Sequence, residues 1–190
     1  MVPADVTALI LAGGKATRLG GIDKHQIVVG GRTIFERQVE VLRSCVAEII
    51  VSSPREVAGY RTVVDAIVDA GPLAGIAAGL AAATTPWLLV LAGDMPNIER
   101  AVIELMLSHG DASADAVGIR IGGLPEPLCS VLRVAVWRPI AAARIATRRL
   151  KVSSLLTEEA MSVRWIDEAA LRAIDPKLRS LHNVNTPEDL

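Results

Sequence analysis

The chain has 190 residues, a length that suits one domain with a full-sized hydrophobic core. Of these residues 51% are hydrophobic and only 3% are aromatic, so the core must be built mainly from Val, Ile, Leu and Ala, as in a parallel sheet covered by helices. The formal net charge is −1 and no basic patch stands out, which argues against binding of nucleic acid or of a membrane surface.

The two cysteines, Cys45 and Cys129, lie far apart and match no metal-binding or disulfide pattern. We expect both to be reduced thiols in the core of a cytoplasmic protein. The first residues contain no basic leader, and their apolar run is too short to span a membrane.

Short apolar runs predict the strands. Nearly continuous runs at Thr7–Ala12, Glu48–Ser53 and Trp87–Ala92 are typical of strands buried on both faces. Further strands are predicted at Val117–Ile121 and Ser130–Leu132. Because helical segments alternate with these runs, we expect one α/β domain over residues 1–190, a three-layer α/β/α sandwich with a Rossmann-like, mostly parallel sheet.

Apolar residues at helical spacing predict the helices between the strands. They are Phe35, Val39 and Leu42 in a first helix, and Ile103, Leu105, Met106 and Leu107 in a second one after Pro96. A weaker helical pattern covers Pro139–Leu156. Near the end of the chain, Thr186 as N-cap and Pro187 at the first helical position predict another helix start.

The strongest functional signal is the string LILAGGKATRLGGIDK, from Leu9 to Lys24. A buried strand is followed by Gly13 and Gly14, whose missing side chains let backbone N–H groups approach an anion or a base edge. Arg18 and Lys24 then add two cations, which completes a cradle for phosphate at the carboxyl end of a strand. The string is neither a P-loop nor a G-x-G-x-x-G dinucleotide fingerprint, and a bare Gly-Gly could be an ordinary turn.

The second signal is Asp94, directly after the predicted strand Trp87–Ala92. One carboxylate at the ligand edge of a sheet suits Mg²⁺, which completes its octahedron with phosphate and water. The alternative is that Asp94 caps a helix that starts near Pro96. The glycine loop favours the metal interpretation.

The third signal is DAGPLAGI, in which Gly71 and Gly75 lie four residues apart at a loop-to-helix junction. Exposed N–H groups at a helix N-terminus can bind an anion. The alternative is an ordinary turn before a helix of small residues that packs tightly on the sheet. His25, His109 and His182 have no ligand spacing, and we interpret them as surface or hydrogen-bonded core residues.

The first string resembles L-A-G-G-K-x-x-R-[LM]-G-G-x-D-K, the signature of the molybdenum cofactor guanylyltransferases within the nucleotidyltransferases. The resemblance continues in order along the chain through Asp65, Gly71-Pro72-Leu73-Ala74-Gly75, Gly93-Asp94-Met95-Pro96, Arg148-Arg149 and Asn183-Val184-Asn185-Thr186-Pro187. It implies the nucleotide-diphospho-sugar transferase type of sandwich. Ser52 departs from the pattern, since some members have an asparagine there that contacts the nucleotide.

The resemblance also implies a role for each matching residue. Lys24, Arg18 and Asp94 are expected to act in catalysis, with Mg²⁺ on Asp94. The nucleotide is expected to contact Leu11, Ala12, Gly13, Gly14, Lys24, Ser52, Asp65 and Asp94. The acceptor is expected to contact Gly71, Gly75, Arg149, Asn183 and Asn185. For the last three residues, a solvated surface charge and a turn before the predicted helix are the alternatives.

The implied reaction joins GTP to molybdopterin that carries molybdenum, and it releases pyrophosphate. The terminal phosphate of the pterin is the nucleophile, so the protein positions the reactants and neutralises charge. Molybdoenzymes or their chaperones would receive the product. Three alternatives stay open: a cytidylyltransferase for the same cofactor, which usually reads L-A-A-G, another small-molecule NTP transferase, and a carrier without catalysis. Lys24, Arg18 and Asp94 argue against the carrier.

Overall fold

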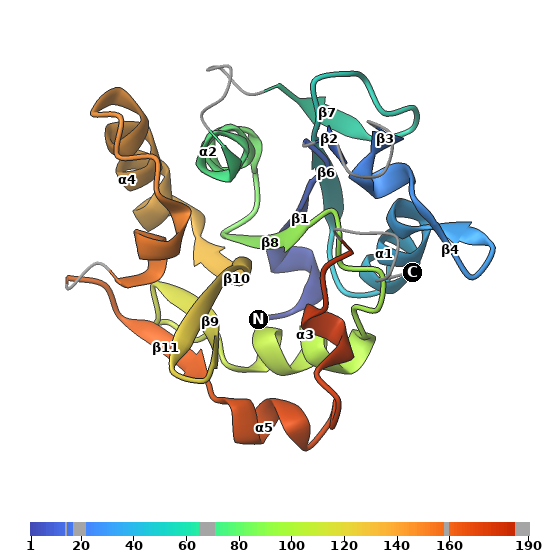
Figure 1. Ribbon diagram of the computed structural model, residues 1–190. Coiled ribbons are helices and arrows are strands. Elements are labelled where there is room, and N and C mark those ends of the chain that lie inside the picture. The colour runs from blue at the N-terminus through green and yellow to red at the C-terminus, as the bar shows by residue number, and fades with distance from the viewer. Residues whose placement is uncertain (14, 17–21, 65–70, 158–159, 185–190) are drawn as a thin grey trace.

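The computed structural model describes residues 1–13, 15–16, 22–64, 71–157 and 160–184, with the backbone alone at residues 15–16 and 22–24. A seven-stranded sheet forms the middle layer (Figure 1). Its strands, in the order in which they lie side by side, are β11 (Val163–Ile166), β9 (Ala116–Ile121), β10 (Leu124–Arg133), β8 (Trp87–Ala92), β1 (Val6–Leu11), β6 (Glu48–Ser52) and β7 (Arg61–Val63). All neighbouring strands are parallel except β10, which is antiparallel to both β8 and β9.

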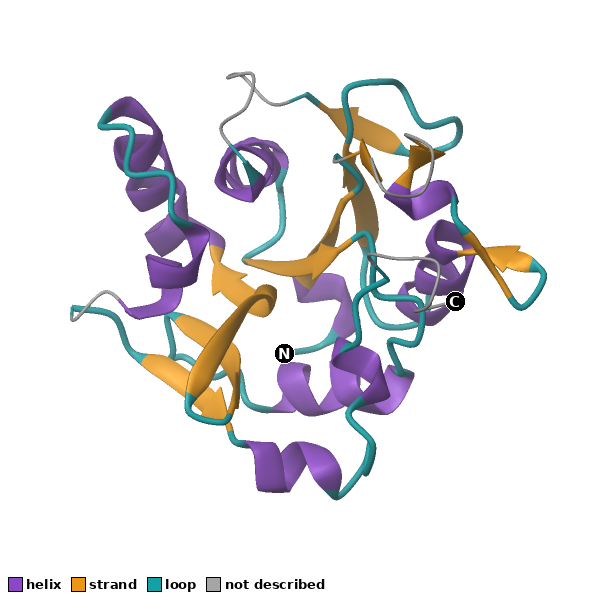
Figure 2. Cartoon of the chain, viewed as in Figure 1, coloured by secondary structure: helices purple, strands orange, loops and turns teal. Residues whose placement is uncertain are grey.

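Helices cover both faces of the sheet (Figure 2). One face packs against α1 (Ile34–Leu42), α3 (Arg100–Ser108) and α5 (Glu168–Arg172), and the other against α2 (Pro72–Ala82) and α4 (Val134–Ala146). The short 3-10 turns are η1 (Pro3–Asp5), η3 (Lys24–Gln26), η4 (Val152–Thr157) and η5 (Arg179–Leu181). Two small hairpins pair β2 (Lys15–Ala16) with β3 (Ile22–Asp23) and β4 (Val28–Val29) with β5 (Arg32–Thr33).

The central strands are buried on both faces, which is why their sequences are continuously apolar. In β1, Ala8 and Ile10 belong to the core under α1 and α3, whereas Leu9 and Leu11 belong to the core under α2 and α4. Strand β8 alternates in the same way. The predicted three-layer α/β sandwich is therefore confirmed, with a sheet that is mostly parallel.

The ends of the helices follow local rules. Helix α1 opens with a capping box, in which the Thr33 hydroxyl accepts a hydrogen bond from the Glu36 amide at 3.1 Å and the Thr33 amide donates to the Glu36 carboxylate at 2.8 Å. Helix α2 follows Gly71, whose φ of 68° suits a residue without a β-carbon, and begins at Pro72. No helix in the described part of the chain is long and apolar enough to cross a membrane.

The prediction of a helical region at Pro139–Leu156 is wrong in its bounds. Helix α4 begins five residues earlier, at Val134, and Pro139 lies inside it. Burial of Val134 and Trp137 against the sheet drives these first turns into a helix despite the proline. The predicted helix at Thr186 lies outside the described residues.

Both cysteines are free and buried, as expected. Burial raises the pKa of the Cys129 thiol to about 12, so this group stays protonated at neutral pH. Neither side chain takes part in a metal site within the described residues.

Candidate active site

The carboxyl ends of β1, β6 and β8 meet at one edge of the sheet. In the strand register, Leu11 lies opposite both Ser52 and Ala92. The segments that leave these strands therefore begin side by side, as the parallel topology requires. This edge holds the glycine turn, Ser52 and Asp94, which the sequence predicts as parts of one site.

The turn after β1 is tied to its neighbours through the backbone. The Ala12 amide donates a hydrogen bond to the Ser52 carbonyl at 2.9 Å. Gly13 is exposed, and a β-carbon built there would meet no atom of the described residues within 4 Å. Gly13 thus leaves open space beside the strand ends, where a planar group can approach the backbone.

His25 brings the backbone of Lys24 to this turn. Its ring Nδ1 donates a hydrogen bond to the Ala12 carbonyl at 3.1 Å, and the residue is 4% exposed. The interpretation of His25 as a hydrogen-bonded core histidine is confirmed. Lys24 begins η3, directly before His25, so its Cα lies close to the end of β1.

Asp94 is half-buried and follows β8 by two residues. The turn is held by the Gly93 amide, which donates to the Leu11 carbonyl at 3.1 Å, and by the Asp94 carbonyl, which accepts from the Val184 amide at 2.9 Å. The alternative that Asp94 caps a helix near Pro96 is wrong, because α3 begins at Arg100 and its N-cap is Glu99. Asp94 therefore lies on the segment that leaves the carboxyl end of β8 and not at the start of a helix.

Two polar residues of α1 that no sequence motif marks also hold this turn. The buried Gln38 amide donates to the carbonyls of Ala92 and Met95, and the Arg37 guanidinium donates to the Pro96 carbonyl at 2.8 Å. In sequence they are simply polar positions on an amphipathic helix. Their partners lie more than fifty residues away, so no local pattern could have indicated them.

The predicted acceptor residues divide between the two faces of the sheet. Gly71 directly precedes α2, and Arg138 of α4 donates to the Leu80 and Ala83 carbonyls at the other end of α2. Arg149 follows α4, which covers the same face of the sheet as α2, and it is exposed to solvent. In Figure 1, α2 lies between α4 and the strands β1 and β6.

Asn183 lies on the other face, next to Val184 and therefore close to Asp94. Its Oδ1 atom is buried and accepts no hydrogen bond from the residues that the structure describes. A buried acceptor of this kind is costly unless a ligand or water supplies a donor. Gly75 is buried inside α2, where it contributes to close packing of that helix.

Several predicted site residues lie outside the described part of the chain. They are Gly14, Arg18, Asp65 and Asn185, together with the side chain of Lys24.

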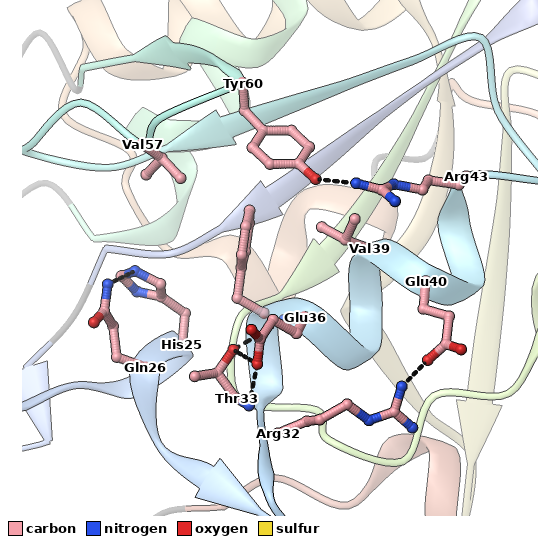
Figure 3. Close-up of a pocket in the computed structure, with 11 residues that line it drawn as sticks. His25, Gln26, Arg32, Thr33, Glu36, Val39, Glu40, Arg43, Val57 and Tyr60 are labelled. Atoms are coloured by element: carbon pink, nitrogen blue, oxygen red, sulfur yellow. Dashed lines mark hydrogen bonds and ion pairs between the residues drawn. The ribbon is translucent and has the colours of Figure 1, made fainter.

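A cavity of about 580 Å³ lies beside α1 and is lined in part by His25, whose ring also contacts the turn after β1 (Figure 3). Its polar side chains pair with one another: Arg32 with Glu40, Glu36 with Thr33, and Arg43 with the Tyr60 hydroxyl at 3.1 Å. Because these polar side chains are already paired with one another, we place the candidate active site at the strand ends and not in this cavity.

A mostly parallel sheet with an open glycine turn and a carboxylate at adjacent strand ends defines the class of α/β proteins that bind nucleotides at the carboxyl edge. The chain belongs to the MobA-like NTP transferase domain family, which matches residues 8–161.

Relatives match over nearly the whole chain. A molybdenum cofactor guanylyltransferase from Pseudomonas putida strain F1 is 35% identical over 188 residues, which cover 96% of this chain and 94% of the relative. One from Pseudomonas aeruginosa strain PAO1 is 37% identical over 187 residues, covering 95% and 90%. The crystal structure of molybdopterin-guanine dinucleotide biosynthesis protein A from Archaeoglobus fulgidus has a TM-score of 0.80 and 24% identity, covering 96% and 94%.

Proposed function

We propose that this chain transfers GMP from GTP to the terminal phosphate of molybdopterin that carries molybdenum, forming the guanine dinucleotide cofactor and pyrophosphate. The observation that carries the proposal is the register of Leu11 with Ala92, which brings the Gly13 turn beside Asp94. Support also comes from the relatives named molybdenum cofactor guanylyltransferase, which match the chain from end to end.

The donor set at the site fits Mg²⁺. Within the described residues, no group of three or more His, Cys, Asp or Glu could hold a metal ion without help. Asp94 offers one carboxylate, and Mg²⁺ is commonly bound by one or two carboxylates together with water and substrate phosphates. When bound, Mg²⁺ supplies positive charge to the phosphate oxygens of GTP and to the leaving pyrophosphate.

The residues of the chain bind and orient the two substrates. We assign the base to the backbone of Leu11–Gly13, and the phosphates to Lys24 and Arg18. Ser52, Gly14 and Asp65 complete the nucleotide side in this proposal. With the α-phosphate fixed in this way, the acceptor phosphate can attack in line, and the reaction needs no protein nucleophile.

The acceptor side is assigned to Gly71, Gly75, Arg149, Asn183 and Asn185. Arg149 has a planar guanidinium suited to phosphate, and Asn183 has the buried Oδ1 atom that accepts no hydrogen bond within the described part of the chain. A donor on the pterin would satisfy this oxygen. Arg149 follows a helix on one face of the sheet and Asn183 lies on the other face, so a pterin and its phosphate would have to extend from one face to the other to reach both.

The test is to incubate the purified chain with molybdopterin and either Mg-GTP or Mg-CTP, and to identify the products by mass spectrometry alongside pyrophosphate release. We expect the guanine dinucleotide and pyrophosphate in equal amounts. Preferential use of CTP would make the chain a cytidylyltransferase. Binding of the cofactor without pyrophosphate release would make it a carrier.

A further inference from the structure

The turn that carries Asp94 is fixed from the side of α1 by one buried amide. Gln38 is 0% exposed, and its Nε2 donates hydrogen bonds to the carbonyls of Ala92 at 2.7 Å and Met95 at 3.2 Å. These two carbonyls bracket Asp94 in the sequence. The amide therefore holds both ends of the short segment on which the carboxylate stands.

The orientation of the amide is determined by its partners. Both contacts are carbonyl oxygens, which only accept, so the nitrogen must face them. The Gln38 Oε1 atom is then left buried without a hydrogen-bond donor among the described residues. A buried acceptor without a donor destabilises a fold, so stability alone does not account for a glutamine at this position.

Packing does not require a glutamine here either. Its neighbours on the buried face of α1 are Ile34, Val39 and Leu42, and an unbranched apolar side chain such as methionine would fill a similar volume. What such a side chain cannot provide is the pair of donors to Ala92 and Met95.

We propose that Gln38 is a positioning residue that orients the Asp94 carboxylate toward the metal–nucleotide complex. The inference rests on the proposed function, because it takes Asp94 as the metal ligand. Groups that orient metal ligands commonly change metal affinity and activity when they are replaced, although they do not touch the metal. Gln38 acts in this way through the backbone of the turn.

The experiment measures binding of Mn²⁺ in the presence of GTP by electron paramagnetic resonance, and the melting temperature of the same samples. The variants are Gln38→Met, which removes both donors, and Gln38→Asn, which keeps an amide but withdraws it from the two carbonyls. The matched control is Thr7→Val, which removes a partly buried side-chain hydrogen bond of 2.8 Å between the buried Thr7 and Thr85 near the opposite end of β1. Asp94→Ala is the reference for loss of the metal ligand.

We expect both Gln38 variants to lower the Mn²⁺ affinity by about tenfold, while Thr7→Val binds Mn²⁺ as the unmodified chain does. Raising the metal concentration should restore most of the turnover of Gln38→Met and little of that of Asp94→Ala. If the Gln38 variants bind Mn²⁺ like Thr7→Val while Asp94→Ala does not, the inference is wrong and the proposed function stands. If Asp94→Ala itself binds Mn²⁺ normally, the assigned metal ligand is wrong. If neither Gln38 variant folds, Gln38 is a structural residue and the inference fails.

Discussion

The Gly93 amide donates a hydrogen bond of 3.1 Å to the carbonyl oxygen of Leu11, and this contact joins the ends of β8 and β1 at the candidate site. A β-carbon built on Gly93 would lie 2.6 Å from the same oxygen. Because that atom belongs to the backbone of a central strand, it cannot rotate away. The close approach therefore requires glycine at this position.

Gly93→Ala should destabilise the fold by about 1–3 kcal/mol, since the two strand ends must separate to admit the methyl group. Gly13→Ala is the matched control, because a β-carbon at Gly13 meets open space. Urea unfolding of both variants measures the difference. Equal stability of the two variants would contradict the close contact.

Asp94→Ala should lower turnover on the order of a thousandfold, which corresponds to about 4 kcal/mol of lost charge stabilisation. The melting temperature should change little, because the Asp94 carbonyl keeps its hydrogen bond from Val184. Steady-state pyrophosphate release measures the turnover, and thermal unfolding measures the melting temperature. Asp94→Asn, which keeps the size of the side chain, should be nearly as inactive if the charge is what matters. Full activity of either variant would show that Asp94 is not part of the active site.

Gly13→Ala should weaken the use of GTP while the fold remains intact. The open space at Gly13 would be partly filled by a methyl group, which would push a bound purine away from the backbone. The measurement is kcat/KM with GTP and with CTP for the variant and the unmodified chain. Equal use of both nucleotides by the unmodified chain would show that Gly13 does not select the base.

The strands were the most predictable part of the fold. Short, nearly continuous apolar runs, as in β1, β6 and β8, are typical of buried strands in a small α/β protein. The short edge strand β7 (Arg61–Val63) was missed because it mixes polar and apolar residues and is stabilised by pairing with β6. Pro139 misled the prediction of α4, since packing of Trp137 outweighed the local preference.

The candidate site was predictable where its residues follow strands directly, as Gly13 and Asp94 do. It was not predictable where a side chain serves the site through distant backbone atoms, as Gln38 does. The helix-cap alternative for Asp94 could not be settled from the sequence, because it depended on where α3 begins.

Arg149→Ala should reduce binding of molybdopterin and leave GTP affinity nearly unchanged, and the Asn183→Ala, Asn185→Ala double variant should do the same. The reason is that, in the proposed function, these residues bind the acceptor, whereas the nucleotide binds at the ends of β1 and β6. Fluorescence titration with each substrate separates the two affinities. If GTP binding is lost and molybdopterin binding is intact, the assignment of these residues to the acceptor is wrong.

Glu126→Gln should raise the melting temperature at neutral pH. Burial raises the pKa of Glu126 above its usual value, so the folded chain holds this proton more tightly than the unfolded chain does. The protonated Glu126 side chain therefore contributes to the free energy of unfolding in acid, and this contribution is lost as the pH rises through the raised pKa. The difference in melting temperature between Glu126→Gln and the unmodified chain should therefore be larger at about pH 7 than at about pH 4. Glu56→Gln, at an exposed position, is the control and should show no such trend.

Strand β8, which leads to Asp94, lies in the middle of an unbroken hydrogen-bonded sheet from β11 to β7. The proposed nucleotide and acceptor sides therefore share one rigid support and are not carried on two bodies joined by a hinge. Rigid-body closure of one half of the sheet onto the other would break the ladder between β8 and β1 or between β8 and β10. Any induced fit in this enzyme must then come from segments that leave the sheet, among them those that carry the proposed acceptor residues Arg149 and Asn183.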